Sequence, residues 1–173
     1  NLPRWRELEQ RIAFGADLRY YDNDVVPVGT SIALVPDYVV HPLSATYSGT
    51  WRAAQSETSA YAGAFRNIPG GANGDQAQFD LVRPGAQAGY LLYRAGFNHL
   101  HSLPADLQFR FNMSGQYTPD ELVPGEQFGI GGQDSVRGFL EREFINDKGF
   151  RGTTEVYSPD FGPRTGIGNL RLR

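Results

Sequence analysis

Apolar and polar residues alternate with a period of two along much of this chain. The clearest case lies near the N-terminus, where Ile12, Phe14, Ala16, Leu18 and Tyr20 alternate with Arg11, Ala13, Gly15, Asp17 and Arg19. Successive side chains of a β-strand point to opposite faces of its sheet. This segment therefore predicts a strand with one uncharged, apolar face.

The same alternation predicts five further strands and the start of a seventh. They lie at residues 45–52, 60–66, 90–98, 107–114 and 150–158, and Leu170 and Leu172 begin the last one. We expect the arginines on the face opposite the aromatic and aliphatic side chains, which in residues 60–66 places Tyr61 and Phe65 on the apolar face. The residues expected on the polar face are Arg11, Asp17, Arg19, Arg52, Arg66, Arg94, Arg110 and Arg151.

Two architectures contain strands of this kind. In an outer-membrane β-barrel the uncharged face contacts lipid and the arginines line the lumen, whereas in a soluble β-sandwich the same face packs inside a core. The connections between the expected strands alternate in length: 22–42, 67–87 and 118–149 are long, and 53–58 and 101–105 are short. Long external loops and short periplasmic turns produce this order. We therefore favour an all-β fold, an antiparallel transmembrane β-barrel segment of six to seven strands.

Composition excludes several other classes of protein. No window approaches the roughly 18–20 uncharged apolar residues of a membrane-spanning helix. The chain has no cysteine, so it has neither a disulfide framework nor a thiolate nucleophile. A net charge of -3 gives no reason to expect binding to nucleic acid.

Residues with catalytic or metal-binding chemistry do not cluster in the sequence. His99 and His101 share one strand face beside a short turn, which is more typical of a surface pair than of a metal site. Ser135 lacks the Gly-x-Ser-x-Gly elbow of a hydrolase, and the glycines at 129, 131 and 132 lack the helix of a phosphate-binding loop. We expect no enzymatic activity, no cofactor and no metal.

A glycine-rich block stands in the last long connection. Residues 122–139 read LVPGEQFGIGGQDSVRGF, and the sequence EVYSP follows at residues 155–159 on the next expected strand. With these motifs the chain resembles the two-partner secretion transporters, outer-membrane proteins that export haemolysin-like and haemagglutinin-like partners. They belong to the superfamily that includes the barrel-assembly insertase. The resemblance runs from the first expected strand to the end of the chain.

The resemblance implies that residues 119–148 form a long loop that folds back into the barrel lumen. The tip of this loop would be Val136, Arg137, Gly138 and Phe139. Gly131 and Gly132 suit turns beside the tip because glycine accepts positive φ angles.

In the family, the arginine of the tip pairs with acidic residues of the inner barrel wall. Glu155 faces inward in the expected register and is our candidate partner for Arg137, since a guanidinium can bind a carboxylate through two hydrogen bonds. A cross-strand ion pair between Glu155 and Arg151 is the alternative. The wall arginines either line a passage for an unfolded polypeptide or are hydrogen-bonded parts of the wall.

The resemblance also implies that residues 1–173 are a C-terminal-half segment of a sixteen-stranded barrel, with periplasmic POTRA modules and further strands outside this sequence. A second wall partner, in an F-x-D-x-G motif, would follow soon after Arg173.

The implied function is an outer-membrane pore that moves an unfolded partner exoprotein to the cell surface and is gated by residues 119–148. The expected partners are this exoprotein and outer-membrane lipid, with no nucleic acid and with one chain per barrel. The alternatives are a barrel-assembly insertase and, more remotely, a soluble β-sandwich binding module.

Overall fold

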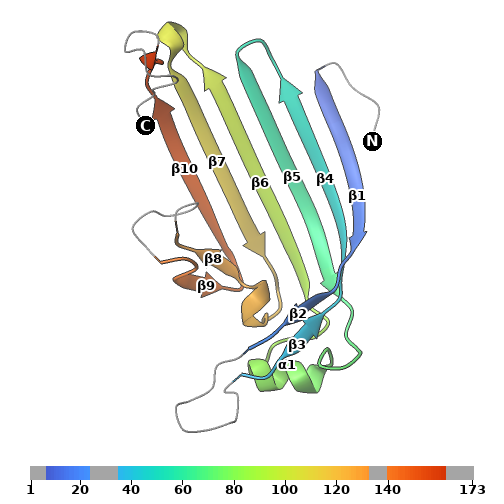
Figure 1. Cartoon of the computed structure of the whole chain (residues 1–173). Helices are drawn as coiled ribbons and strands as arrows, with labels where there is room; N and C mark the ends of the chain where they lie inside the picture. Colours follow the sequence, from blue (N-terminus) through green and yellow to red (C-terminus); the bar gives the residue numbers. More distant parts are fainter. Residues whose placement is uncertain (1–6, 24–34, 133–139, 163–173) are drawn as a thin grey trace.

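The computed structural model describes residues 7–23, 35–132 and 140–162. Six strands form one antiparallel sheet in the order β1-β4-β5-β6-β7-β10 (Figure 1). They are β1 (Leu8–Ala16), β4 (Pro42–Arg52), β5 (Ser56–Asn67), β6 (Leu91–Ser102), β7 (Gln108–Tyr117) and β10 (Gly149–Tyr157). The six strands expected from the alternation are therefore present as neighbours in chain order. The seventh, at Leu170 and Leu172, lies outside the described residues.

The connections alternate in length along the sheet. Short turns join β4 to β5 and β6 to β7, the second through a 3-10 turn at Pro104–Asp106. The long connections gather at the opposite end of the strands, the lower end in Figure 1. We call the two ends of the sheet the turn end and the loop end.

The long connections contain regular elements that the alternation did not predict. β2 (Arg19–Tyr21) and β3 (Tyr38–Val40) form one two-stranded sheet, and β8 (Phe128–Ile130) and β9 (Phe144–Asn146) form another. A short helix, α1 (Gln76–Val82), begins at Asp75, whose side chain accepts a hydrogen bond from the backbone N–H of Gln78. The helix found among the described residues is too short and too polar to cross a membrane.

The prediction of one continuous strand from residue 11 to residue 20 is wrong. The strand ends at Ala16, and Arg19 then belongs to β2, which pairs with β3 instead of with the large sheet. The Asp17 side chain accepts hydrogen bonds from the backbone N–H of Leu18 (2.9 Å) and from Nε of Arg19 (2.8 Å), which turns the chain at this point. Asp17 and Arg19 therefore do not share a strand with Arg11.

The large sheet has one apolar and one polar face, because residues paired directly across two strands point to the same side. The apolar face carries Ile12 and Phe14 of β1, Tyr47 and Trp51 of β4, Tyr93 and Phe97 of β6, Phe109, Phe111 and Met113 of β7, and Phe150 and Val156 of β10. Many of these side chains are exposed, and Phe14 reaches 82%. The opposite, polar face carries Arg11, Arg52, Arg94, Arg110 and Arg151.

The prediction for the two faces of β5 is reversed in the structure. Arg66 pairs with Leu43 on one side and with Leu91 on the other, so it lies on the apolar face and not among the other wall arginines. Tyr61 and Phe65 instead lie on the polar face, where the Phe65 ring is 5.3 Å from the guanidinium carbon of Arg94. Apart from Glu57 and Arg66 near its two ends, both faces of this strand are uncharged, and within residues 60–66 a single terminal arginine was not enough to set the register.

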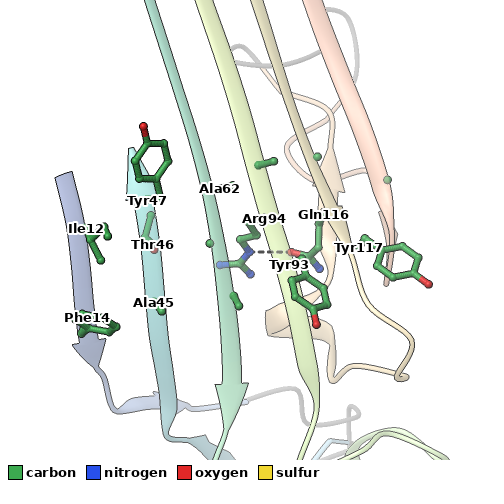
Figure 2. A pocket seen from close by; sticks show the side chains of 15 residues that line it. Ile12, Phe14, Ala45, Thr46, Tyr47, Ala62, Tyr93, Arg94, Gln116 and Tyr117 are labelled. Carbon is green, nitrogen blue, oxygen red and sulfur yellow. Dashed lines mark hydrogen bonds between the residues drawn. The ribbon is translucent and has the colours of Figure 1, made fainter. Parts of the chain in front are cut away.

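A shallow groove of about 690 Å³ crosses the apolar face (Figure 2). Alanines of three strands, such as Ala45, Ala62 and Ala95, line it, and the larger side chains of Tyr47 and Tyr93 stand beside them. The exposed side chains around this groove show that the apolar face is not the main core among the described residues.

The buried core lies instead at the loop end, where the long connections pack on the polar face. It consists of Tyr38, Val40, Phe79, Ala86, Ala88, Tyr90, Leu92, Leu122 and Val123. Leu92 belongs to the polar face of β6, since it pairs with Phe65. The buried Asn67 at the end of β5 links two connections, because it accepts a hydrogen bond from the His41 N–H (2.6 Å) and donates one to the Ala88 carbonyl (2.7 Å). At the loop end, the long connections thus pack as a buried layer over the polar face of the sheet.

Candidate functional site: two buried anchors of the last long connection

A buried carboxylate holds the last long connection (residues 118–148) to the rest of the loop end. Glu126 is only 1% exposed. Its Oε1 atom accepts hydrogen bonds from Nη1 of Arg19 (2.6 Å) and from the Tyr21 hydroxyl (2.8 Å), and its Oε2 atom lies 3.6 Å from Nη2 of Arg94. A buried carboxylate is tolerated only when cations and hydrogen-bond donors compensate for lost water. The Glu126 anchor therefore joins β2, β6 and this connection.

One wall side chain binds both halves of the connection. The amide nitrogen of Gln116, on the polar face of β7, donates to the backbone carbonyls of Glu126 (2.9 Å) and Asp147 (3.1 Å). Its amide oxygen accepts a hydrogen bond from Nε of Arg94 (2.9 Å; Figure 2). Gln116 is 5% exposed, so these bonds are made largely away from water. The start and the end of the connection therefore meet at the same point of the wall.

A second carboxylate anchors the end of the connection. Asp147 receives two hydrogen bonds from the guanidinium of Arg83, which follows α1, at 2.7 and 3.1 Å. It also accepts hydrogen bonds from the Leu122 N–H (3.1 Å) and from the side chain of Gln127 (2.9 Å). Burial raises the pKa of Asp147, but these partners outweigh burial, and the pKa lies below its ordinary value of 3.8.

The β8–β9 hairpin continues from these anchors along the polar face. A Cβ atom built on Gly149 of β10 would lie 2.8 Å from Cδ1 of Phe128, so the Phe128 ring covers that glycine. The guanidinium carbon of Arg151 is 6.0 Å from the centre of the same ring. Gly131 and Gly132 follow β8 with φ angles of 125° and 91°, the conformation for which glycine is suited.

The remaining expected wall residues have these positions. Arg52 forms ion pairs with Glu9 (3.0 Å) and Glu57 (2.9 Å) near the turn end. Arg110 lies over the Tyr157 ring at 5.4 Å, and Arg151 donates to the Ser114 hydroxyl at 3.2 Å.

Glu155 lies on the polar face of β10. It is the direct cross-strand neighbour of Arg110 and accepts a hydrogen bond from the Tyr157 hydroxyl at 2.7 Å. Val136, Arg137, Gly138 and Phe139 lie outside the described residues, so the pairing of Arg137 with Glu155 stays a prediction.

Four side chains at these anchors, Glu126, Gln116, Asp147 and Arg83, were not predicted from the sequence as functional residues. Glu126 stands in the glycine-rich block, where an acidic residue in the mostly uncharged stretch 122–132 was a signal for a specific role. Gln116 continues the polar face of β7 by two residues and could have been found by extending that strand. Asp147 and Arg83 carry no comparable signal, since they meet only through tertiary packing. No group of acidic residues and histidines within residues 7–23, 35–132 and 140–162 could hold a metal ion.

The antiparallel sheet, with one exposed apolar face and one polar face, has the architecture of a segment of an outer-membrane β-barrel. The family model of the haemolysin secretion/activation proteins ShlB/FhaC/HecB matches residues 6–166, and the chain belongs to this family of two-partner secretion transporters of the Gram-negative outer membrane. Among solved structures, CdiB from Escherichia coli is similar with a TM-score of 0.68 and 19% sequence identity, over 91% of this chain and 28% of CdiB. A search of curated proteins gave no significant match. The chain thus corresponds to part of a transporter barrel.

The Glu126 anchor can be tested with Glu126→Gln in the full-length protein. The substitution keeps the size of the side chain but leaves Arg19 and Arg94 without their shared carboxylate, at a cost of up to about 3 kcal/mol. We expect faster amide hydrogen exchange in residues 122–130, measured by mass spectrometry. Glu57→Gln is the matched control, because it breaks an exposed ion pair and should leave the exchange of this segment unchanged. Equal exchange in wild type and Glu126→Gln would show that the anchor does not hold the connection.

The Asp147 anchor predicts a defined pH dependence. Since the pKa of Asp147 is lowered in the folded protein, its stabilising contribution is complete above 3.8 and is lost as the pH falls through the lowered value. Exchange of residues 144–148, corrected for the intrinsic pH dependence, should stay constant from about pH 7 to about pH 5 and increase only below the ordinary pKa. Asp147→Asn should exchange rapidly across the whole range. Loss of protection already near pH 5 in the wild type would contradict this assignment.

Proposed function

We propose that the whole protein forms a monomeric outer-membrane pore through which an unfolded partner exoprotein reaches the cell surface. In this proposal the apolar face of the sheet contacts lipid, the polar face lines the lumen, and the loop end faces outside. The exposed aromatic side chains of one face and the charged side chains of the other support this orientation of the wall. The match to the secretion family supports an exoprotein as the cargo.

The last long connection is the proposed gate of the pore. The observation that carries this proposal is the pair of hydrogen bonds from Gln116, which hold both halves of the connection on the polar face. A segment held at that position would reduce the cross-section of the lumen, and the exoprotein could pass only after it shifts. The sequence contains no nucleotide-binding motif, so folding of the cargo outside the cell would drive the transport.

The proposed lock of this gate is an ion pair between Arg137 and Glu155. Arg137→Ala and Glu155→Gln in the full-length protein should each alter single-channel conductance in planar bilayers and lower secretion of the exoprotein by cells. If the two residues bind each other, the double variant should be no worse than either single one, and the exchange Arg137→Glu with Glu155→Arg should restore part of the activity.

Thr154→Ala is the matched control, because Thr154 is the chain neighbour of Glu155 in β10 but lies on the apolar face, away from the lumen. It should leave both measurements at the wild-type level. Unchanged conductance and secretion in Arg137→Ala would reject the lock. Additive losses in the double variant would reject the pairing and favour another partner for Glu155, with Arg110 as its neighbour in the sheet.

A further inference from the structure

Arg66, which lies on the apolar face of the sheet, has surroundings that suit a ligand. Arg66 is exposed on the apolar face, with Leu43 and Leu91 as its direct neighbours in the adjoining strands. The part of the chain that the structure describes provides no ion pair, hydrogen bond or aromatic ring for its guanidinium. An unpaired cation on an otherwise apolar face calls for an anion supplied from outside the chain.

A groove of about 510 Å³ lies next to this strand position, since its lining includes Leu43, the cross-strand partner of Arg66. It is lined by Ala16, Asp17, Leu18, His41, Leu43 and Ile68. Three of these apolar side chains are well exposed, Leu18 at 65%, Leu43 at 49% and Ile68 at 44%. An open hydrocarbon surface therefore adjoins the strand position of an exposed arginine, a combination that suits an amphiphile with an anionic head.

The position along the strand agrees with the boundary of a membrane. Two residues on the apolar side of β5 mark its ends. Thr58 lies near the turn end, where it pairs with Trp51, and Arg66 lies near the loop end. Eight residues of strand separate them, which corresponds to about 26 Å along the strand. Because barrel strands tilt by about 35–45°, this length rises by only about 20 Å within an apolar band about 25 Å tall. The long side chain of Arg66 would therefore extend from just inside the band toward the lipid headgroups on the side opposite Trp51.

We propose that Arg66 and the adjoining groove bind a phosphorylated glycolipid of the outer leaflet, with the guanidinium on a phosphate and an acyl chain along Leu18, Leu43 and Ile68. This inference rests on the proposed orientation, in which the loop end faces outside. Guanidinium matches phosphate through parallel hydrogen bonds, and these are strengthened where the site borders hydrocarbon. An arginine that only reached the interface to be hydrated would show no preference among lipid headgroups.

The other charged group of the groove is compatible with an anion. Asp17 contributes a carboxylate, but this carboxylate is bound to Nε of Arg19 (2.8 Å) and to the Leu18 N–H (2.9 Å), which lower its pKa and keep its charge compensated. His41 adds an imidazole to the lining, and its ring N–H is a further donor for a phosphate oxygen.

The test measures lipid retention by the full-length transporter in detergent, by native mass spectrometry. The probe is diphosphorylated lipid A, and lipid A stripped of its phosphates and inorganic phosphate are the comparison ligands. We expect Arg66→Gln to bind the diphosphorylated lipid about tenfold more weakly than the wild type, as the loss of a charged hydrogen bond predicts. Arg11→Gln, on the polar face, should bind the diphosphorylated lipid as the wild type does. Arg66→Lys keeps the positive charge, so its affinity should lie between those of Arg66→Gln and the wild type, and this residual binding would show that the barrel still folds.

Equal binding by Arg66→Gln and the wild type would overturn the proposal, as would equal binding of the lipid with and without phosphates. Strong retention of inorganic phosphate alone would also overturn it, because the groove would then play no part.

A labelling experiment separates failure of the site from failure of the orientation. The chain lacks cysteine, so Leu81→Cys at the loop end and Ala54→Cys at the turn end each introduce one thiol into this segment. An impermeant maleimide on intact cells should label position 81 and not position 54. The opposite labelling would reject the orientation, and the inference with it, whereas the expected labelling without a lipid preference would reject the lipid site alone.

Discussion

The buried carboxylate of Glu126 is the constraint on which the loop end depends. It has to be compensated, and the groups that do so come from different places in the chain: Arg19 and Tyr21 from β2, and Arg94 from the wall strand β6. Removing Arg19 or Arg94 would leave the buried carboxylate with less compensating charge, and removing Tyr21 would take away one of its hydrogen-bond donors. The first and last long connections are therefore coupled to each other and to the wall through a single side chain.

The sheet itself has a simpler basis. Alternation with a period of two gives one face whose exposed residues are aromatic and aliphatic and another that carries arginines and their acidic or aromatic partners. The polar face offers hydrogen-bonding groups such as Gln116, and the last long connection is held there by them. The same two-sided pattern makes Arg66 unusual, because its strand places a charge where the rest of the face has none.

The fold was predictable where the alternation is strong and less so elsewhere. Strands such as β1 and β7 have one face rich in apolar residues and one face with arginine, and the alternation therefore predicted which side chains lie on each face of the sheet. In β5 both faces consist mainly of small or aromatic residues, so only pairing with β4 and β6 decides the register, and Arg66 was assigned to the wrong side.

The site was predictable in part for a related reason. The glycine-rich block identified the important connection and the family, because its motif is local in the sequence. The anchors join residues far apart in the sequence, 107 positions for Arg19 and Glu126 and 64 for Arg83 and Asp147, and no local pattern encodes such contacts. β2 was missed because the apolar–polar pattern continues through Asp17, where the hydrogen bonds of the Asp17 side chain turn the chain.

In the assembled barrel the last long connection should lie on the polar face of the wall. A disulfide test is the most direct, since the full-length protein can be given two cysteines at Phe128 and Gly149, which are in contact on that face. Under mild oxidation in intact cells this pair should cross-link, whereas cysteines at Phe128 and Gly152, which lies on the apolar face of the same strand, should not. Failure of the first pair, or equal cross-linking of both, would contradict the account.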